Sequence, residues 1–270
     1  MFDEIRKIPF FVIRDLRMLF TYKLALSAAL FGVVFNLFYF VLFGSMFGST
    51  VIASLSDYGG NYISYLLVGS IGWGFLWSIM QATSASLSEE MRMGPLESIL
   101  LTPTKLSTLM IAYSIYGCLF GFIIFIILLF VGFFIFGITV FATASIYTLI
   151  IFILSIAMMT GFGMIFGGLT IWLKNIGETV TLIQSISMFF CGVYFPISVL
   201  PEYLQPIAEY MPFYYSIEGL RRSLIPSYSS DMLFFVGMLI FWSVLSIALG
   251  LTILHLGLIK AKKEGSLAFY

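Results

Sequence analysis

Charged residues are rare in this chain of 270 residues, and their absence from long stretches is its most informative property. Asp, Glu, Lys and Arg make up only 10% of the residues, whereas 61% are hydrophobic. No Asp, Glu, Lys, Arg or His lies between Lys105 and Lys174. That run is long enough for two membrane crossings of about 20 apolar residues each. The composition excludes an ordinary soluble domain, and the continuous apolar runs exclude the alternating strands of a transmembrane barrel.

The residue types that build catalytic and metal sites are also scarce. His255 is the only histidine, and Cys118 and Cys191 are the only cysteines. This set is too small for a metal site with normal ligand numbers, and both cysteines are expected to pack as small hydrophobes. No GxxxxGK[ST] sequence occurs, so ATP and Mg²⁺ are expected on a separate ATPase polypeptide. The formal net charge of zero gives no reason to expect nucleic acid. We therefore predict no catalytic residue, metal or cofactor in this chain.

The long apolar runs predict an all-α integral membrane protein with one transmembrane domain over residues 1–270. Six transmembrane helices are expected at about 24–47, 61–88, 106–137, 144–172, 179–198 and 232–259. Residues 1–23 are charged and amphipathic, which predicts an N-terminal interfacial helix rather than a cleaved signal. The alternative is a basic leader that only fixes orientation. The spacings Gly117-x3-Gly121 and Gly163-x3-Gly167 favour close packing of helices.

Basic residues are distributed unequally between the two sides of the predicted helices. Eleven of the 13 Lys and Arg residues fall on the side of the termini, and only Arg221 and Arg222 fall on the other. Because basic loops stay in the cytoplasm, both termini are expected to be cytoplasmic in a multi-pass protein of the plasma membrane.

The predicted outer connection, residues 199–231, is longer than a turn and rich in proline. Its amphiphilic pieces Pro201–Met211 and Tyr215–Leu224 are too short to span and are expected to be re-entrant or surface helices. Glu218 precedes Arg221 and Arg222 by three and four residues, which favours a local ion pair on one helix face. Contact of these arginines with an anionic lipid or substrate is the alternative.

The predicted cytoplasmic connection, residues 89–105, contains a second short helix. Gly94 is expected to end the preceding helix, Pro95 suits the first position of the next, and Thr102-Pro103 stops it. Glu97 falls in the first turn, where the helix dipole favours an acid. The pattern predicts a stiff amphipathic helix, which without a partner would be a plain surface helix.

The interiors of the predicted spans contain neutral polar residues but no Asp, Glu, Lys or Arg. Ion-coupled carriers need such groups inside the membrane, and channels need a polar or charged ring, so neither class is favoured. In the fifth span Gln184 is followed by Met188, Phe189 and Phe190. This mixture is typical of a mostly apolar site oriented by few hydrogen bonds, and it favours an apolar or amphiphilic substrate. The alternative is that Gln184 and Asn36 only bridge helices.

Three segments in order carry a resemblance to the ABC-2 type family of ABC exporter permeases. The first runs from Glu90 to Pro103, although Glu90 and Arg92 are spaced apart and Pro95 replaces the usual threonine. The second is Asn175-x-x-Glu178, followed by a span ending in Phe195-Pro196-Ile197-Ser198. The third is Met211-Pro212-Phe213-Tyr214-Tyr215-Ser216-Ile217-Glu218-Gly219-Leu220-Arg221, in which methionine stands at the family's first position.

The resemblance implies a transmembrane export subunit that pairs with ABC ATPase subunits and with a second permease copy, as a homodimer or heterodimer. Leu96, Ile99 and Leu100 are expected to face the ATPase, with Glu97 and Arg92 as polar anchors. The full expected coupling segment is Glu90, Arg92, Gly94, Pro95, Leu96, Glu97, Ile99, Leu100, Thr102 and Pro103. The fifth span and the first two are expected near the dimer axis, which adds Asn36 and Gln81 to the substrate path. A non-transport scaffold or sensor subunit of a larger complex is the alternative function.

Overall fold

The computed structural model describes residues 2–46, 62–102, 104–136, 145–174, 176–224 and 231–264. Within these ranges the regular elements are all helices, and no strand occurs. The elements are α1 (Phe2–Thr21), α2 (Lys23–Met46), α4 (Tyr62–Met93), α5 (Pro95–Leu101), α6 (Leu106–Phe136), α7 (Ile146–Leu173), α8 (Gly177–Phe190), the 3₁₀ turn η2 (Ile197–Val199), α9 (Gln205–Tyr210), α10 (Pro212–Ser223) and α11 (Met232–Glu264). The predicted all-α class is confirmed.

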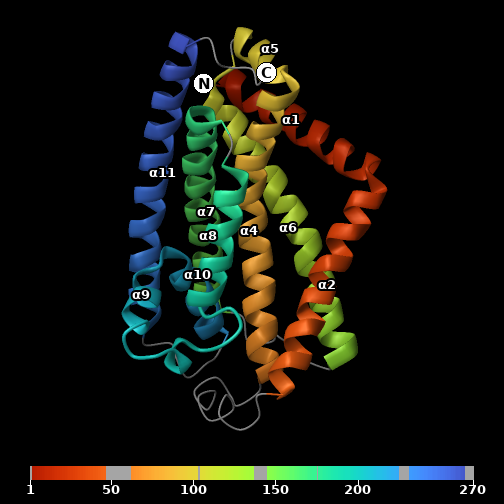
Figure 1. The fold of residues 1–270 in the computed structure, drawn as a ribbon, viewed down its shortest axis with the longest axis vertical. Helices are drawn as coiled ribbons and strands as arrows, with labels where there is room; N and C mark the ends of the chain where they lie inside the picture. The colour runs from red at the N-terminus through yellow and green to blue at the C-terminus, as the bar shows by residue number, and fades with distance from the viewer. Residues whose placement is uncertain are drawn as a thin grey trace.

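The long helices run alternately up and down between two ends of the molecule (Figure 1). α1, α5 and the last turns of α11 lie together at one end, and η2, α9 and α10 lie at the other. The first helix and the last therefore meet at the same end. An even number of membrane crossings would give this arrangement.

Four helices, α4, α6, α7 and α11, are long and apolar enough to cross a membrane. A fifth crossing is counted if α1 and α2, which meet at a bend of 85°, are taken as one broken span. The 24 residues of α2 closely match the predicted first span. The number of six transmembrane helices remains a prediction, because the fifth predicted span is not formed by one long helix.

The predicted fifth span, residues 179–198, is not one continuous helix. α8 has 14 residues, which corresponds to about 21 Å, against about 30 Å for the hydrocarbon core of a bilayer. The helix ends at Phe190, and Gly192 then adopts a left-handed conformation with φ of 69°. The chain beyond it is irregular until η2. A glycine in this conformation turns the chain at low cost, which explains why the helix stops inside an apolar run.

α1 covers nearly all of the predicted N-terminal interfacial helix, residues 1–23. It has 20 residues and includes Pro9 in its interior. Its bend of 85° to α2 is the geometry of a helix lying beside the bundle rather than within it. Val12 is buried against the protein, whereas Arg17 is exposed.

α4 is the central helix, and glycines allow its neighbours to approach closely. A Cβ atom on Gly117 of α6 would lie 2.7 Å from Ile79 Cα, and one on Gly163 of α7 would lie 2.6 Å from Thr83 Cβ. Neither distance is tolerable for a real side chain, so the close packing predicted from both glycine pairs is confirmed at these positions. The hydroxyl of Ser78 also donates to the carbonyl of Gly117 at 2.9 Å, which joins α4 to α6.

Candidate functional site

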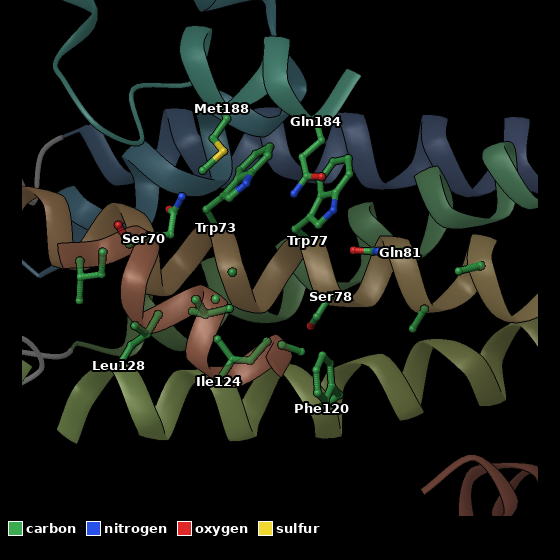
Figure 2. Close-up of a pocket in the computed structure, with 18 of the residues that line it drawn as sticks. Ser70, Trp73, Trp77, Ser78, Gln81, Phe120, Ile124, Leu128, Gln184 and Met188 are labelled. Carbon is green, nitrogen blue, oxygen red and sulfur yellow. The ribbon is translucent and has the colours of Figure 1, made fainter. Parts of the chain in front are cut away.

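A cavity of about 870 Å³ lies between α2, α4, α6 and α8, and the residue just beyond α8, Tyr194, completes its wall. Figure 2 shows the wall formed by α4, with α6 on one side of it and α8 on the other. The polar side chains of the lining are Asn36, Ser70, Ser78, Gln81, Ser86, Gln184, Ser185, the phenols of Tyr116 and Tyr194, the two indoles of Trp73 and Trp77, and the carboxylate of Glu89. The lining is otherwise apolar. It therefore suits a ligand with a large apolar surface and few polar groups.

α4 supplies a continuous wall because its lining residues recur every three or four positions along one helix face. They are Ser70, Trp73, Gly74, Trp77, Ser78, Gln81, Ala82, Ala85, Ser86 and Glu89. Seven of these are Gly, Ala, Ser or Gln, and the small ones leave the space that the cavity occupies. Trp73 and Trp77 stack on one another with ring centroids 5.3 Å apart. This face of α4 thus combines open space with one rigid aromatic pair.

The structure brings together four of the six residues predicted for the substrate path. Asn36, Gln81, Gln184 and Met188 line the same cavity from three helices. Phe189 and Phe190 do not line it. Phe189 instead contacts Phe190 and Phe195 in edge-to-face geometry and is 47% exposed. Because α8 presents Gln184 and Met188 to the cavity, Phe189 is turned toward a different face.

The sequence-based set lacks the five aromatic residues of the cavity lining, of which Tyr116 and Phe120 lie on α6 and three lie on α4 or just after α8. The hydroxyl of Tyr194 donates to Asn36 Oδ1 at 3.1 Å and lies 3.5 Å from Met188 Sδ. Trp73 and Trp77 are the other two. Their spacing of four residues, continued by Gln81 after another four, is a signal in the sequence that places all three on one face. Tyr194 gives no such signal, because it lies in the irregular segment after α8.

An ion pair lies at the α5 end of the cavity lining. Glu89 and Arg92, one helical turn apart on α4, form hydrogen bonds of 2.7 and 3.1 Å. Glu89 is the one carboxylate in the described lining, and no lysine or arginine of the described chain lines the cavity. Away from its α5 end, the described lining thus has no positive or negative side chain that could pair with a charged ligand.

The short helix α5 follows α4 through a sharp corner, as the sequence predicts. Gly94 has φ of 90°, Pro95 is the first residue of α5, and the helix ends at Leu101 with Thr102 as its C-cap. Arg92 and Pro95 are exposed, as is Met93, and Leu101 is 84% exposed. Leu96, by contrast, is fully buried among Leu87, Met91 and the α6 residues Leu106 and Leu109.

These positions change the expected ATPase-facing surface of α5. Leu96 holds α5 against the permease core and is not available to a partner, so its predicted role at the ATPase surface is corrected. Ile99 is partly buried against the same core. The side chains of Glu97 and Leu100, and Pro103 as a whole, lie outside the described residues.

α1 is attached to both ends of the α4–α5–α6 corner. Near its middle, Arg14 pairs with Glu90 at 2.5 Å, and the Glu90 side chain is only 9% exposed. Near its start, the Glu4 carboxylate accepts hydrogen bonds from the hydroxyl of Thr108 at 2.7 Å and from the backbone N–H of Lys105 at 3.2 Å. Glu90 was expected to belong to the ATPase-coupling surface. It instead faces α1.

Glu4 is held in its charged form by these contacts. Hydrogen bonds from Lys7, Thr108 and Lys105 lower the pKa of Glu4 to about 2. A carboxylate whose pKa is lowered on folding adds stability above its ordinary pKa of about 4.3 and loses it as the pH falls through the lowered value. The attachment of α1 to α6 is therefore complete at neutral pH.

Comparison with known families gives one match, which covers most of the chain. Residues 16–225 match the family described as ABC-2 type transporter. The chain belongs to the ABC-2 type transporter family. Comparison with curated proteins finds no match. As an ABC-2 permease, the protein is a multi-pass membrane subunit of an ABC transporter, and its family implies association with an ABC ATPase subunit.

At the far end of the ABC-2 permease, a buried charge cluster joins α10 to α4 and to the chain after α8. Glu218 pairs with Arg221 at 2.9 Å and with Arg222 at 2.8 Å, which gives the local ion pair predicted from their spacing. Arg221 is 2% exposed and donates to the Gly192 carbonyl at 2.9 Å. Its guanidinium also lies over the Tyr65 ring at 3.6 Å, and the Tyr65 hydroxyl donates to the same carbonyl.

These contacts favour the local ion pair as the role of Arg221 over contact with an anionic lipid or substrate. Arg222 is more exposed, but it too is paired, with Glu218 and with Asp231 at 3.4 Å. A buried charge is tolerated only when it is paired and hydrogen-bonded, and Arg221 meets both conditions. The cluster fixes the irregular segment after α8, which is the segment that closes the cavity with Tyr194.

Proposed function

We propose that this ABC-2 permease is the transmembrane subunit of an ATP-driven exporter that moves an apolar or amphiphilic substrate outward. Drug-like molecules, lipids and glycolipids belong to this class. The observation that carries the proposal is the cavity between α2, α4, α6 and α8 in a chain of this family. Most of its lining surface is apolar, and its polar groups are neutral except for the Glu89 carboxylate at the α5 end. A charged group would lose its hydration there without gaining a partner.

The proposed ATPase partner, a separate chain that binds ATP and Mg²⁺, docks on the exposed face of α5. Met93 and Leu101 are 61% and 84% exposed, and Arg92 and Pro95 lie beside them. Movement of α5 reaches α1 through the Arg14–Glu90 pair and reaches α2 through the bend between α1 and α2. The orientation proposed for this arrangement places α5 and both termini in the cytoplasm of a plasma membrane, with six crossings.

A second permease copy, identical or related, is proposed to cover the open face of α8. Of the 14 residues of α8 only Val180 and Ser187 are buried. Leu182, Ile186 and Phe189 are each at least 41% exposed. A partner at this face would bring Phe189 close to the dimer axis without requiring it to line the cavity of its own chain.

A substitution that fills the cavity tests the transport proposal. Ala85 lines the cavity and is exposed to it, so Ala85→Phe should occupy the space without disturbing the packing. Ala248→Phe on the exposed side of α11 is the matched control. Permease and ATPase are reconstituted in liposomes, and ATP-dependent movement of a panel of amphiphiles is measured together with the amount of assembled complex.

We expect Ala85→Phe to reduce transport at least about tenfold, a loss of about 1.4 kcal/mol, while the assembled complex stays at the level of the control. Equal transport by both variants would contradict the assignment of the cavity as the path. If the unmodified complex moves none of the amphiphiles, the scaffold or sensor function replaces the exporter.

A further inference from the structure

Two indole N–H groups in the wall of the cavity have no hydrogen-bond acceptor. Trp73 and Trp77 are 3% and 4% exposed, and neither Nε1 atom has a partner within the described structure. The hydroxyl of Ser70, one turn before Trp73, is also buried without a partner. All three groups belong to the cavity-facing side of α4. Buried polar groups are nearly always paired, so three unpaired ones on a single helix face need an explanation.

The unpaired groups share a chemical character, because each can donate a hydrogen bond. An indole N–H is a donor only. Three other hydroxyls of the lining already donate within the protein: Ser78 and Ser185 to backbone carbonyls, and Tyr194 to Asn36. Neither indole, by contrast, has an acceptor in the described protein. A substrate that brings an uncharged oxygen would satisfy donors that the protein leaves unsatisfied.

Side chains of α8 lie over the two indoles on the cavity side. In Figure 2 their rings extend from α4 toward α8, where the Met188 side chain lies beside Trp73 and that of Gln184 beside Trp77. Met188 and Gln184 have unbranched stems that change rotamer readily. A ligand that turns them aside would gain access to the two indoles. Trp73 is held from behind by edge contact with Phe213, so the ring itself need not move.

We propose that the cavity selects uncharged amphiphiles whose ester, ketone or ether oxygens accept hydrogen bonds from Trp73 and Trp77. The inference rests on the proposed transport function and names the substrate class of the same cavity. The stacked indoles supply an apolar platform for the body of the substrate, and their N–H groups fix the position of its oxygens. Cations and anions of equal chain length are disfavoured, because the described lining has no charged side chain away from its α5 end that could pair with them.

The test measures binding directly in the permease–ATPase complex, held in lipid nanodiscs without nucleotide. The probes are radiolabelled monolauroylglycerol, dodecyltrimethylammonium and laurate, which share a chain length and differ in charge. We expect monolauroylglycerol to bind most tightly. Trp73→Phe and Trp77→Phe should each weaken its binding about threefold to tenfold, the value of one hydrogen bond between neutral groups. Trp242→Phe is the matched control, since its indole N–H is also unpaired but lies on α11 outside the cavity.

A second substitution separates the N–H group from the ring. Benzothienylalanine keeps the bicyclic shape of tryptophan and lacks the N–H donor, so at position 73 or 77 it should weaken binding as much as Phe does. Benzothienylalanine variants that bind monolauroylglycerol like the unmodified protein would overturn the proposal. Tighter binding of either charged probe, or no measurable binding of monolauroylglycerol, would overturn it as well.

Transport in liposomes, measured with the same variants, distinguishes this inference from the proposed function. If monolauroylglycerol binds through the indoles but ATP does not drive its movement, the substrate class stands and the transport function fails. If ATP drives its movement equally with benzothienylalanine at either position, the transport function stands and the donor role of the indoles fails.

Discussion

At the scale of single residues, the buried charged side chains of this permease are held by ion pairs within the protein. Glu90 is almost completely buried and pairs with Arg14, which is 37% exposed. The sequence places Glu90 next to a helix that is expected to meet the ATPase, but the fold turns it toward α1. Glu90 therefore connects α4 to α1 within the permease and does not belong to the ATPase-facing surface.

Arg14→Gln should destabilise the permease more than the same change at Arg17. The first substitution leaves the buried Glu90 without its counter-charge, at a cost of about 1–3 kcal/mol. The second changes an exposed side chain of the same helix and should cost no more than about 0.5 kcal/mol. Thermal unfolding of the detergent-solubilised protein measures both, and Arg14→Gln combined with Glu90→Gln should recover part of the loss. Equal unfolding temperatures for the two single variants would show that the pair contributes nothing.

Gly69 is the residue that lets the Arg221 cluster reach α4. A Cβ atom at Gly69 would overlap the Val193 carbonyl oxygen and lie 2.8 Å from Arg221 Nη2. We expect Gly69→Ala to cost about 1–3 kcal/mol, because a packed site must shift to accept the methyl group. Gly237→Ala, in a helical position with open space, is the control and should be neutral or stabilising. The measurement is again thermal unfolding, and a neutral Gly69→Ala would mean that the cluster adapts freely.

At the scale of elements, the corner between α4 and α5 is set by one glycine. Nothing lies within 4 Å of a Cβ atom built at Gly94, so a side chain there meets no steric obstacle. The constraint comes from the backbone alone, since φ of 90° is unfavourable for residues with a Cβ by about 1–2 kcal/mol. The direction in which α5 leaves α4 therefore depends on this residue.

Gly94→Val should weaken coupling to the proposed ATPase, whereas Gly94→Asn should largely preserve it. Asparagine tolerates the left-handed conformation and valine does not. Substrate-stimulated ATP hydrolysis by equal amounts of assembled complex measures the effect. We expect a loss of about fivefold or more for valine and less than twofold for asparagine, a difference of at least about 0.5 kcal/mol. Identical stimulation in both variants would mean that α5 is a surface helix without a coupling role.

At the scale of the whole molecule, the two ends differ in charge and in structure. α5 and the start of α1 mark one end, and η2, α9 and α10 mark the other (Figure 1). The basic residues of the sequence predict that the α5 end faces the cytoplasm. The predicted outer loops near residues 56 and 229 lie outside the described residues. The orientation is therefore tested at exposed residues of the described helices.

Single cysteines at Ser98 and Ser198 should report the orientation. Both residues are exposed, and they lie at opposite ends of the fold. In a background without Cys118 and Cys191, an impermeant maleimide added to intact cells should label position 198, and position 98 only after permeabilisation. Labelling of position 98 in intact cells, with none at 198, would reverse the orientation.

The sequence by itself determined the class, the long helices, the α4–α5 corner and the family. These features depend on local information: the length of apolar runs, the helical period of small and large residues, and the backbone conformation available to glycine and proline. The Glu218 ion pairs were predictable for the same reason, because residues three and four apart on a helix are neighbours. Gln184 and Met188 line the cavity as expected for residues of one predicted path, which itself stays a prediction.

Only the tertiary structure decided which distant residues face each other. The pairing of Arg14 with Glu90 and the burial of Leu96 both depend on contacts between separate segments of the chain. The position of Phe189 outside the cavity depends on the rotation of α8 about its own axis, which an apolar sequence surrounded by lipid does not fix. Periodicity shows which residues share a face of a helix, but the face that meets a neighbour is chosen by packing, and the cavity is what that packing leaves open.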